Sequence, residues 1–184
     1  IYWHMVSKLL LATKENYFLA INTNSNEEEL GKMVQHFFDV RAGIGLNKSP
    51  EVFGAFPTDA YSHTPGNSGA KQPGMTGQVK EDIIARFGEL GVVVDEGKIS
   101  FNPGLLRKSE FLVTPEDFNF VTVQNQSETI ALNTQNLAFT FCQVPVVYHN
   151  SPNDTIQIRK FNGESIQIKG LTIDNQTSNE IFNR

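Results

Sequence analysis

The sequence predicts an α+β protein in which helices come first and an antiparallel β-sandwich follows. Hydrophobic residues recur at helical spacing as far as Gly91, and beyond it they alternate with polar residues, which is the period of a strand. Clusters of Gly, Pro, Asn and Asp separate the alternating segments, as in antiparallel β-domains. We therefore expect a helical domain over residues 1–91, with a long loop at 44–75, and a β-sandwich domain over residues 92–184.

Two helices are expected at the start of the chain. Residues 2–21 are apolar nearly all round the predicted helix, so this helix is expected to be buried on most sides. After a polar turn, Ser25 or Asn26 is placed to cap a second helix that ends at Gly43. Consecutive glutamates occupy the first turn of this second helix, where the positive end of the helix dipole stabilises them. The short connection predicts an αα-hairpin.

A third helix is predicted over residues 78–90, with Thr76 as its N-cap and Gly91 as its C-terminal stop. Its apolar face carries Val79, Ile83, Ile84, Phe87 and Leu90. The opposite face carries small residues and one carboxylate: Gly77, Glu81, Ala85 and Gly88. Such a face indicates close packing or a cavity, with Glu81 as its charged group. The alternative is that the glycines only flank the helix ends and that Glu81 lies in water.

The loop at residues 44–75 precedes this helix and is rich in Gly and Pro. Long loops without periodicity are uncommon inside compact domains and often carry function. A loop that delivers polar groups to a helix N-terminus is a common way to build a binding site, because free N–H groups and the helix dipole are already there. His63, Thr64 and Gln72 are the polar side chains that we expect this loop to contribute, although a histidine in a loop is more often a surface residue.

The β-region is predicted from its alternation and turn signals. We expect strands at residues 92–95, 98–101, 111–113, 118–123, 129–132, 137–148, 155–160 and 165–168, with a further short strand at Ile173. Their inward-facing residues are Phe118, Phe120, Phe139, Phe141, Ile156, Ile158, Ile166 and Ile168. The single cysteine, Cys142, lies in an apolar run and is predicted to be a small buried residue. We expect no sugar site on these strands, because no group of aromatic residues marks a binding platform.

Composition excludes several classes of function. The net charge is −5 and there is no basic run, so nucleic acid and anionic membranes are poor partners. One cysteine excludes an internal disulfide, and no two histidines have the spacing of metal ligands. We therefore expect neither a metal site nor a cofactor. The abundance of Asn, Gln and Thr in the last third is in keeping with a periplasmic or secreted protein.

The candidate catalytic residues of this sequence are carboxylates. No G-x-S-x-G nucleophile elbow, P-loop or dinucleotide-binding glycine motif is present. The carboxylates in and near the third helix are Asp59, Glu81, Asp82 and Glu89. Sugar hydrolysis uses two carboxyl groups, one as acid and the other as base or nucleophile. Glu81 is the best single candidate, because it stands alone on the small-residue face.

The run from Thr76 to Leu106, TGQVKEDIIARFGELGVVVDEGKISFNPGLL, resembles the closing segment of six-hairpin (α/α)-toroid glycosidases and glycoside phosphorylases. In that group a small-residue turn leads into a last barrel helix, a Leu-Gly exit, a hairpin and a proline-containing link to a C-terminal β-domain. Gly77, Leu90-Gly91, residues 98–101 and Asn102-Pro103 take these places. The resemblance covers residues 1–106 as the last toroid helices, and it implies a carbohydrate-active enzyme.

The resemblance also implies roles for single residues. The phosphorylases hold phosphate at the turn where this chain has Glu81 and Asp82, and carboxylates there would repel phosphate. A hydrolase is therefore favoured, inverting in its stereochemistry, with Glu81 as the base that activates water. The acid would lie upstream of Ile1, because both ends of the chain resemble cuts, and this part alone is not expected to be active. The residues expected to contact an oligo- or polysaccharide are His63, Thr64, Gln72, Trp3 and His4.

Two other interpretations stay open. The chain can be a non-catalytic carbohydrate-binding or structural module, in which Glu81 is merely solvated. It can also be a surface protein that partner contacts hold together. His4 has a similar choice, because a buried histidine beside Trp3 is usually a satisfied core residue, whereas at i and i+4 it shares a face with Lys8 that can line a polar cavity.

Overall fold

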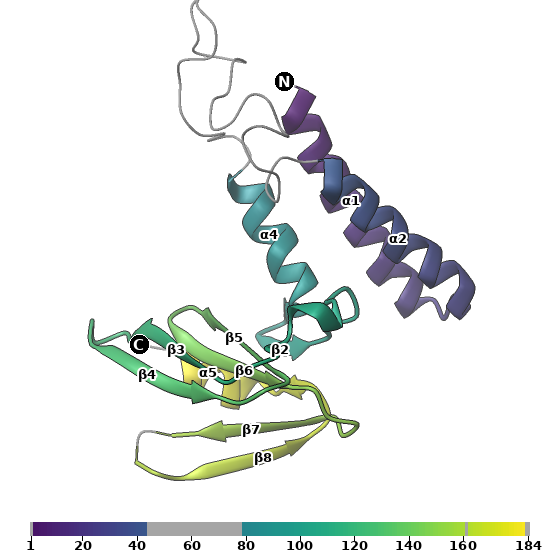
Figure 1. Cartoon of the computed structure of the whole chain (residues 1–184). Coiled ribbons are helices and arrows are strands. Elements are labelled where there is room, and N and C mark those ends of the chain that lie inside the picture. Colours follow the sequence, from purple (N-terminus) through teal and green to yellow (C-terminus); the bar gives the residue numbers. More distant parts are fainter. Residues whose placement is uncertain (1, 44–78, 161, 183–184) are drawn as a thin grey trace, which may run out of the picture. The chain divides into compact units, whose positions relative to one another are not determined.

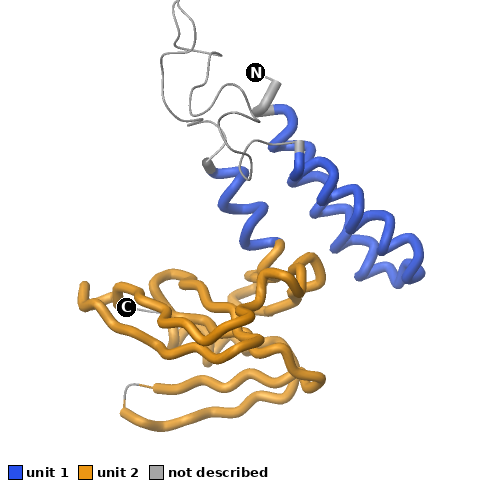
Figure 2. The backbone as a smooth tube through the Cα atoms, in the orientation of Figure 1, with its two compact units in different colours: residues 1–88 blue, residues 89–184 orange. Residues whose placement is uncertain are grey.

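The protein is an α+β protein in the computed structural model, which describes residues 2–43, 79–160 and 162–182 (Figure 1). The chain divides into two compact units, Ile1–Gly88 and Glu89–Arg184 (Figure 2). The first unit carries the helices that apolar residues at helical spacing predicted. The second carries all the described strands and one further helix.

The first unit contains an antiparallel helical hairpin of α1 (Tyr2–Asn22) and α2 (Glu27–Gly43) (Figure 1). Its buried hydrophobic residues are Leu10, Tyr17, Ala20, Phe37 and Phe38. The Asn26 side-chain oxygen accepts a hydrogen bond from the Glu29 amide at 2.9 Å, so Asn26 is the N-cap of α2 as predicted. A cap of this kind stabilises a helix by about 1 kcal/mol.

The expectation that α1 is buried on most sides is wrong for its described side chains. Met5, Leu9 and Leu19 are 63%, 52% and 60% exposed. The helix buries one stripe instead, because the short loop to α2 brings a single partner onto one face. Met5 and Leu9 thus form an exposed apolar surface near the start of α1, and the side chains of Tyr2 and Trp3 lie outside the description.

The third predicted helix is α4 (Val79–Glu89), and its exit is set by a glycine. Gly91 has φ of +76°, a left-handed conformation that ends the helix as the sequence predicted. A side chain there would also collide with the backbone, since a Cβ atom on Gly91 would lie 2.0 Å from the Asn102 carbonyl carbon. The predicted N-cap, Thr76, lies outside the described residues.

The second unit is built from antiparallel strands in four separate sheets. The first sheet joins β1 (Val92–Asp95), β2 (Lys98–Phe101) and β9 (Thr172–Ile173). The other three are two-stranded hairpins: β3 (Glu116–Val121) with β4 (Ser127–Leu132), β5 (Asn136–Phe141) with β6 (Val144–His149), and β7 (Thr155–Arg159) with β8 (Ser165–Lys169).

The core of the second unit uses the alternation read from the sequence. Buried Ile99, Phe101 and Ile173 form its centre, and partly buried residues pack against them: Val92, Phe141, Val146, Tyr148, Ile156, Ile158, Ile168, Ile181 and Phe182. In the last hairpin Ile156 pairs with Ile168, and both strands alternate between exposed and half-buried residues. Of the predicted inward residues Phe120 is buried, and the others are half-buried rather than enclosed.

The Tyr148 hydroxyl joins this core to the end of α4. It donates a hydrogen bond to the carbonyl oxygen of Leu90, one of the carbonyls that a helix C-terminus leaves without a partner in the helix. Burial raises the pKa of this hydroxyl, so it stays a donor at neutral pH. The bond thereby ties β6 to the segment that precedes β1 within the second unit.

Two predictions for the strands were wrong. The predicted single strand at 137–148 is the hairpin β5–β6, because Cys142 and Gln143 form a two-residue turn with φ of +48° and +63°. Such turns match the twist of a hairpin even without glycine. Cys142 is consequently exposed, not buried. Residues 111–113 form no strand. They follow a short 3-10 helix, Lys108–Glu110, which begins directly after Arg107.

The chain also forms a final helix that the sequence did not predict, directly after the predicted short strand at Ile173. The final helix α5 (Asn175–Phe182) is capped by Asp174, whose carboxylate oxygen accepts a hydrogen bond from the Thr177 amide at 2.9 Å. Ile181 and Phe182 from this helix pack on the β-core. Apolar residues before Asp174 alternate with the two-residue period of a strand, so the change to helical spacing after Asp174 was not recognised.

Candidate functional site

The small-residue face of α4 is the face that is buried. Ala85 is 3% exposed, and a Cβ atom on Gly88 would lie 2.1 Å from Cδ of Lys14 in α1. The predicted close packing at this face is therefore present, with the aliphatic part of Lys14 as the packed group. By contrast Ile83 and Ile84, on the apolar face, are 51% and 49% exposed.

Glu81 lies in the first turn of α4 on this buried face and is itself half-buried. Its Oε2 atom is enclosed and has no hydrogen-bond partner within the part of the chain that the structure describes. Buried carboxylate oxygens are normally paired, because removing one from water without a partner is costly. An enclosed carboxylate oxygen without a partner among the described residues therefore calls for an explanation, of which a catalytic role is one.

Asp82, which was only one of several carboxylates in the sequence, shares this environment. Its Oδ1 atom is also enclosed without a hydrogen-bond partner among the described residues. Burial raises the pKa of the Asp82 carboxyl group, and the neighbouring charge of Glu81 raises it further. The Asp82 carboxyl group therefore binds a proton more readily than an isolated aspartate would.

A third polar group of the same kind is Ser7 in α1. Its side chain is 1% exposed, and its hydroxyl has no hydrogen-bond partner in the described ranges 2–43, 79–160 and 162–182. Sequence reasoning missed it. In the sequence, Ser7 is a single hydroxyl residue on the stripe of α1 that also contains Leu10 and Lys14. The other side chains of that stripe are long or apolar.

The structure does not describe the surroundings of the other predicted site residues. Trp3 and His4 lie in the first turn of α1, but their side chains lie outside it. His63, Thr64 and Gln72 lie outside the described residues altogether. Glu81 is thus the one predicted site residue whose surroundings are known, and Ser7 and Asp82 are the polar groups that the sequence did not single out.

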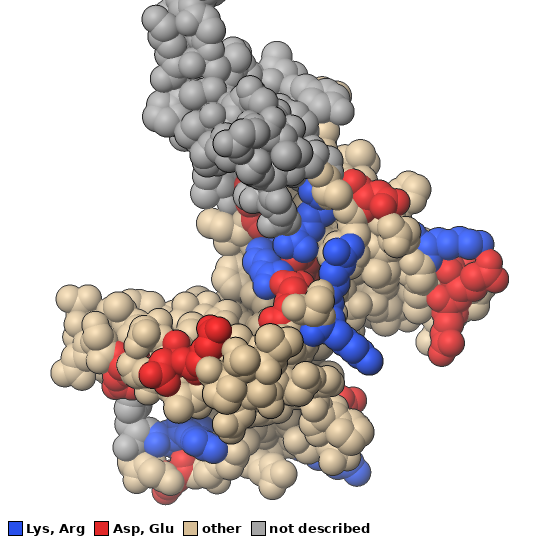
Figure 3. Space-filling view, in the orientation of Figure 1, with Lys and Arg blue, Asp and Glu red and all other residues tan. Residues whose placement is uncertain are grey.

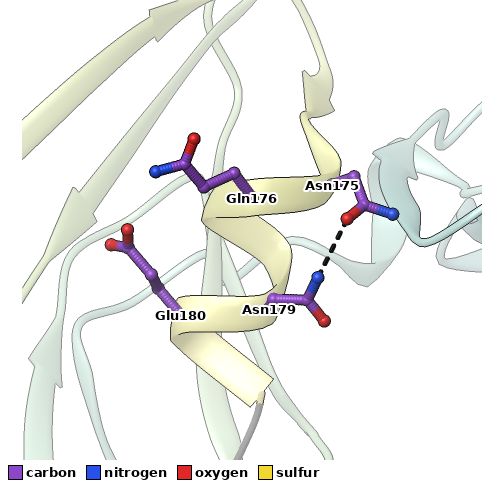
Figure 4. A pocket seen from close by; sticks show the side chains of 4 residues that line it. All are labelled: Asn175, Gln176, Asn179 and Glu180. Atoms are coloured by element: carbon purple, nitrogen blue, oxygen red, sulfur yellow. Dashed lines mark hydrogen bonds between the residues drawn. The ribbon is translucent and has the colours of Figure 1, made fainter.

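A separate depression of about 530 Å³ lies along α5 (Figure 4). It is open to solvent and is lined by Asn175, Gln176, Asn179 and Glu180. The Asn179 amide donates to the Asn175 side-chain oxygen at 2.9 Å, and the Asn175 amide donates to the Glu96 carbonyl at 2.9 Å. These bonds fix two amides on the depression, and no aromatic ring lines it.

Charged side chains of both signs lie on the visible face of the described residues (Figure 3). On the face shown in Figure 3, basic and acidic side chains are interspersed. The searched part of the chain contains no group of three or more His, Cys, Asp or Glu that could hold a metal ion. None of its described helices combines the length and the apolar character needed to cross a bilayer.

Comparison with known proteins does not assign the chain to a family. No protein-family model matches the chain, and no curated protein matches its sequence.

Proposed function

We propose that the chain is part of an inverting glycoside hydrolase of the six-hairpin type that acts on an oligo- or polysaccharide, with Glu81 as the base that activates water. In this proposal residues 1–91 are the last helices of the toroid, and the antiparallel sheets of residues 92–184 form the β-sandwich that follows them. The proton donor would be a carboxylic acid outside this chain, and His63, Thr64, Gln72, Trp3 and His4 would contact the sugar.

The observation that carries this proposal is the enclosed carboxylate oxygen of Glu81 on the small-residue face of α4, which has no hydrogen-bond partner among the described residues. A general base needs one oxygen free to accept a proton from water, in a place where bulk solvent does not fill the site. Asp82 beside it supplies a second carboxyl group that can carry a proton.

The proposal is tested by Glu81→Gln in the protein that contains this chain. Hydrolysis of oligosaccharides should fall by about 10²–10⁴-fold with binding retained, because the amide keeps the shape but removes the base. Proton NMR of the released sugar should show an inverted anomeric configuration in the parent protein.

Glu29→Gln is the matched control for this variant. Glu29 has the same side chain and also lies in the first turn of a helix, α2, but it is exposed. Its replacement should leave turnover unchanged. Turnover of the Glu81→Gln protein at the level of the control would remove Glu81 from the mechanism.

The second candidate is a non-catalytic carbohydrate-binding module, and the depression on α5 favours it. Amide and carboxylate groups such as those of Asn175, Gln176 and Glu180 form hydrogen bonds with sugar hydroxyls. Titration of isotope-labelled protein with oligosaccharides separates the candidates. Shifts confined to Asn175, Gln176 and Asn179, without hydrolysis, would favour the binding module.

A further inference from the structure

The turn between β7 and β8 contains the one Asn-Gly pair of the sequence, Asn162-Gly163. Both residues are exposed, and Gly163 has φ of +88° with no atom within 4 Å of an added Cβ. An asparagine that precedes glycine is the least hindered place for a backbone nitrogen to attack a side-chain amide, because glycine has no side chain beside that nitrogen. The space around this turn therefore leaves such an attack open.

The side chain of Asn162 is bent toward the backbone that follows it. Its Oδ1 atom accepts a hydrogen bond from the Glu164 amide at 3.0 Å, which turns the side-chain carbonyl toward the next two residues. A backbone N–H on a carbonyl oxygen also stabilises the negative charge that develops there when a nucleophile adds to the carbonyl carbon. The Asn162 side-chain nitrogen has no hydrogen-bond partner among the described residues, so nothing there holds it back as a leaving group.

The backbone nitrogen of Gly163 is the atom placed to attack. It donates a hydrogen bond to the Lys160 carbonyl at 3.0 Å, and this bond must open first. The turn joins the strands of a two-stranded sheet, and no third strand lies beside them in the described part of the chain. Two-stranded hairpins are marginally stable by themselves, so their turns can open locally while the rest of the domain stays folded.

We propose that Asn162 is a site of spontaneous deamidation, in which the chain modifies itself with water as the co-reactant. The Gly163 nitrogen loses its proton and bonds to Cγ of Asn162. The Cγ–Nδ2 bond breaks, and Nδ2 leaves as ammonia with that proton. The succinimide ring then takes up one water, with the hydroxyl on either ring carbonyl carbon and the proton on the nitrogen. The products are aspartate and isoaspartate, and in isoaspartate the main chain runs through Cγ.

This proposal does not depend on the proposed function, and it has a structural consequence. Either product adds a negative charge to the turn, and isoaspartate also lengthens the backbone of the turn by one carbon. Across this turn the Lys160 amide donates to the Glu164 carbonyl at 2.8 Å, and Lys160 Nζ lies 3.2 Å from a carboxylate oxygen of Glu180 in α5. A longer turn disturbs both contacts, so isoaspartate should loosen the β7–β8 hairpin.

The first test follows residue 162 by mass spectrometry. The folded protein is incubated at mildly alkaline pH, and its peptides are measured at intervals. Residue 162 should gain the mass of a deamidation, faster as the pH rises, because attack needs the deprotonated nitrogen. An isoaspartate methyltransferase should label the same peptide. If Asn162 stays unchanged in the folded protein, or is modified only in urea, the proposal is overturned.

Asn150 is the matched internal control, because it is also exposed but is followed by serine. Its side-chain amide donates to Gln135 Oε1 at 2.9 Å, and it should stay unmodified over the same incubation. Gly163→Ala adds a Cβ atom beside the attacking nitrogen without a collision elsewhere, so it should slow the conversion of Asn162 several-fold with the fold retained. Conversion of this variant at the parent rate would show that the Gly163 nitrogen is not the nucleophile.

The second test measures the loosening of the hairpin. Hydrogen exchange with mass spectrometry compares fresh protein, aged protein and the variant Asn162→Asp, which has the new charge but the ordinary backbone. Exchange should be fastest in the aged protein at residues 155–169 and unchanged at 116–132, which form the separate hairpin of β3 and β4. Equal exchange at 155–169 in the aged protein and in Asn162→Asp would overturn the role given to the longer backbone.

Discussion

Replacement of Gly91, even by alanine, should strongly destabilise the fold. It combines a left-handed φ of +76° with a backbone carbonyl carbon that lies 2.0 Å from the position of an added Cβ atom. A left-handed conformation alone costs a residue with a side chain about 1–2 kcal/mol. The collision with Asn102 adds to this, because backbone atoms cannot move aside as the end of a side chain can.

Gly91→Ala should therefore lower the free energy of unfolding by about 3 kcal/mol or more, and Gly163→Ala by only about 1 kcal/mol. Gly163 is the matched control, since its φ is +88° and no atom lies within 4 Å of an added Cβ. Urea unfolding followed by circular dichroism measures both. Equal losses in the two variants would show that the collision at Asn102 contributes nothing.

At the same scale, the sequence predicted the carboxylate of the candidate site but not the hydroxyl. Glu81 could be found because its helix face otherwise holds only small residues. Ser7 could not, because a single serine in an apolar helix has no periodic signal of its own. Its burial depends on tertiary packing of α1, which the sequence alone does not show.

Among the elements, α5 depends on a capping interaction that pH can remove. Hydrogen bonds from the backbone amide and then the side chain of Thr177 lower the pKa of the Asp174 carboxyl group. A carboxyl group whose pKa is lower in the folded state contributes stability above its unfolded pKa, and this is lost as pH falls through the folded pKa. The loss should begin below the ordinary value of 3.8.

We expect Asp174→Asn to reduce the difference in unfolding free energy between pH 7 and pH 2.5. Asparagine still caps the helix but does not titrate, so the variant should be less stable than the parent near pH 7 and closer to it in acid. Urea unfolding at both pH values provides the measurement. The control is Asp117→Asn, because Asp117 is an exposed residue of strand β3. An unchanged pH dependence in Asp174→Asn would contradict the assignment.

Most elements could be predicted because their patterns are local. The helices at 2–22, 27–43 and 79–89 and the hairpins joined by Gly-containing turns follow from apolar periodicity and known turn residues. The turn at Cys142 and Gln143 could not be predicted in this way. Neither residue favours a positive φ, so the turn is imposed by the pairing of β5 with β6 and not by its own residues. That pairing also exposes Cys142, which its apolar neighbours in the sequence had predicted to be buried.

For the whole molecule, the division into two compact units has an energetic consequence. The core of the first unit, around Phe37 and Phe38, is separate from the cluster around Ile99, Phe101 and Ile173 in the second. Units with their own cores can unfold independently, so a cavity in one core should lower the stability of that unit alone.

Phe37→Ala and Phe101→Ala test this consequence as a pair. Each removes a buried phenylalanine, 0% and 7% exposed respectively, and should lower the stability of its own unit by about 3–5 kcal/mol. Native-state hydrogen exchange with mass spectrometry should show faster exchange in peptides from 2–43 for Phe37→Ala. For Phe101→Ala it should show faster exchange in peptides from 92–149. If each variant accelerates exchange equally in both regions, the two units unfold as one cooperative body.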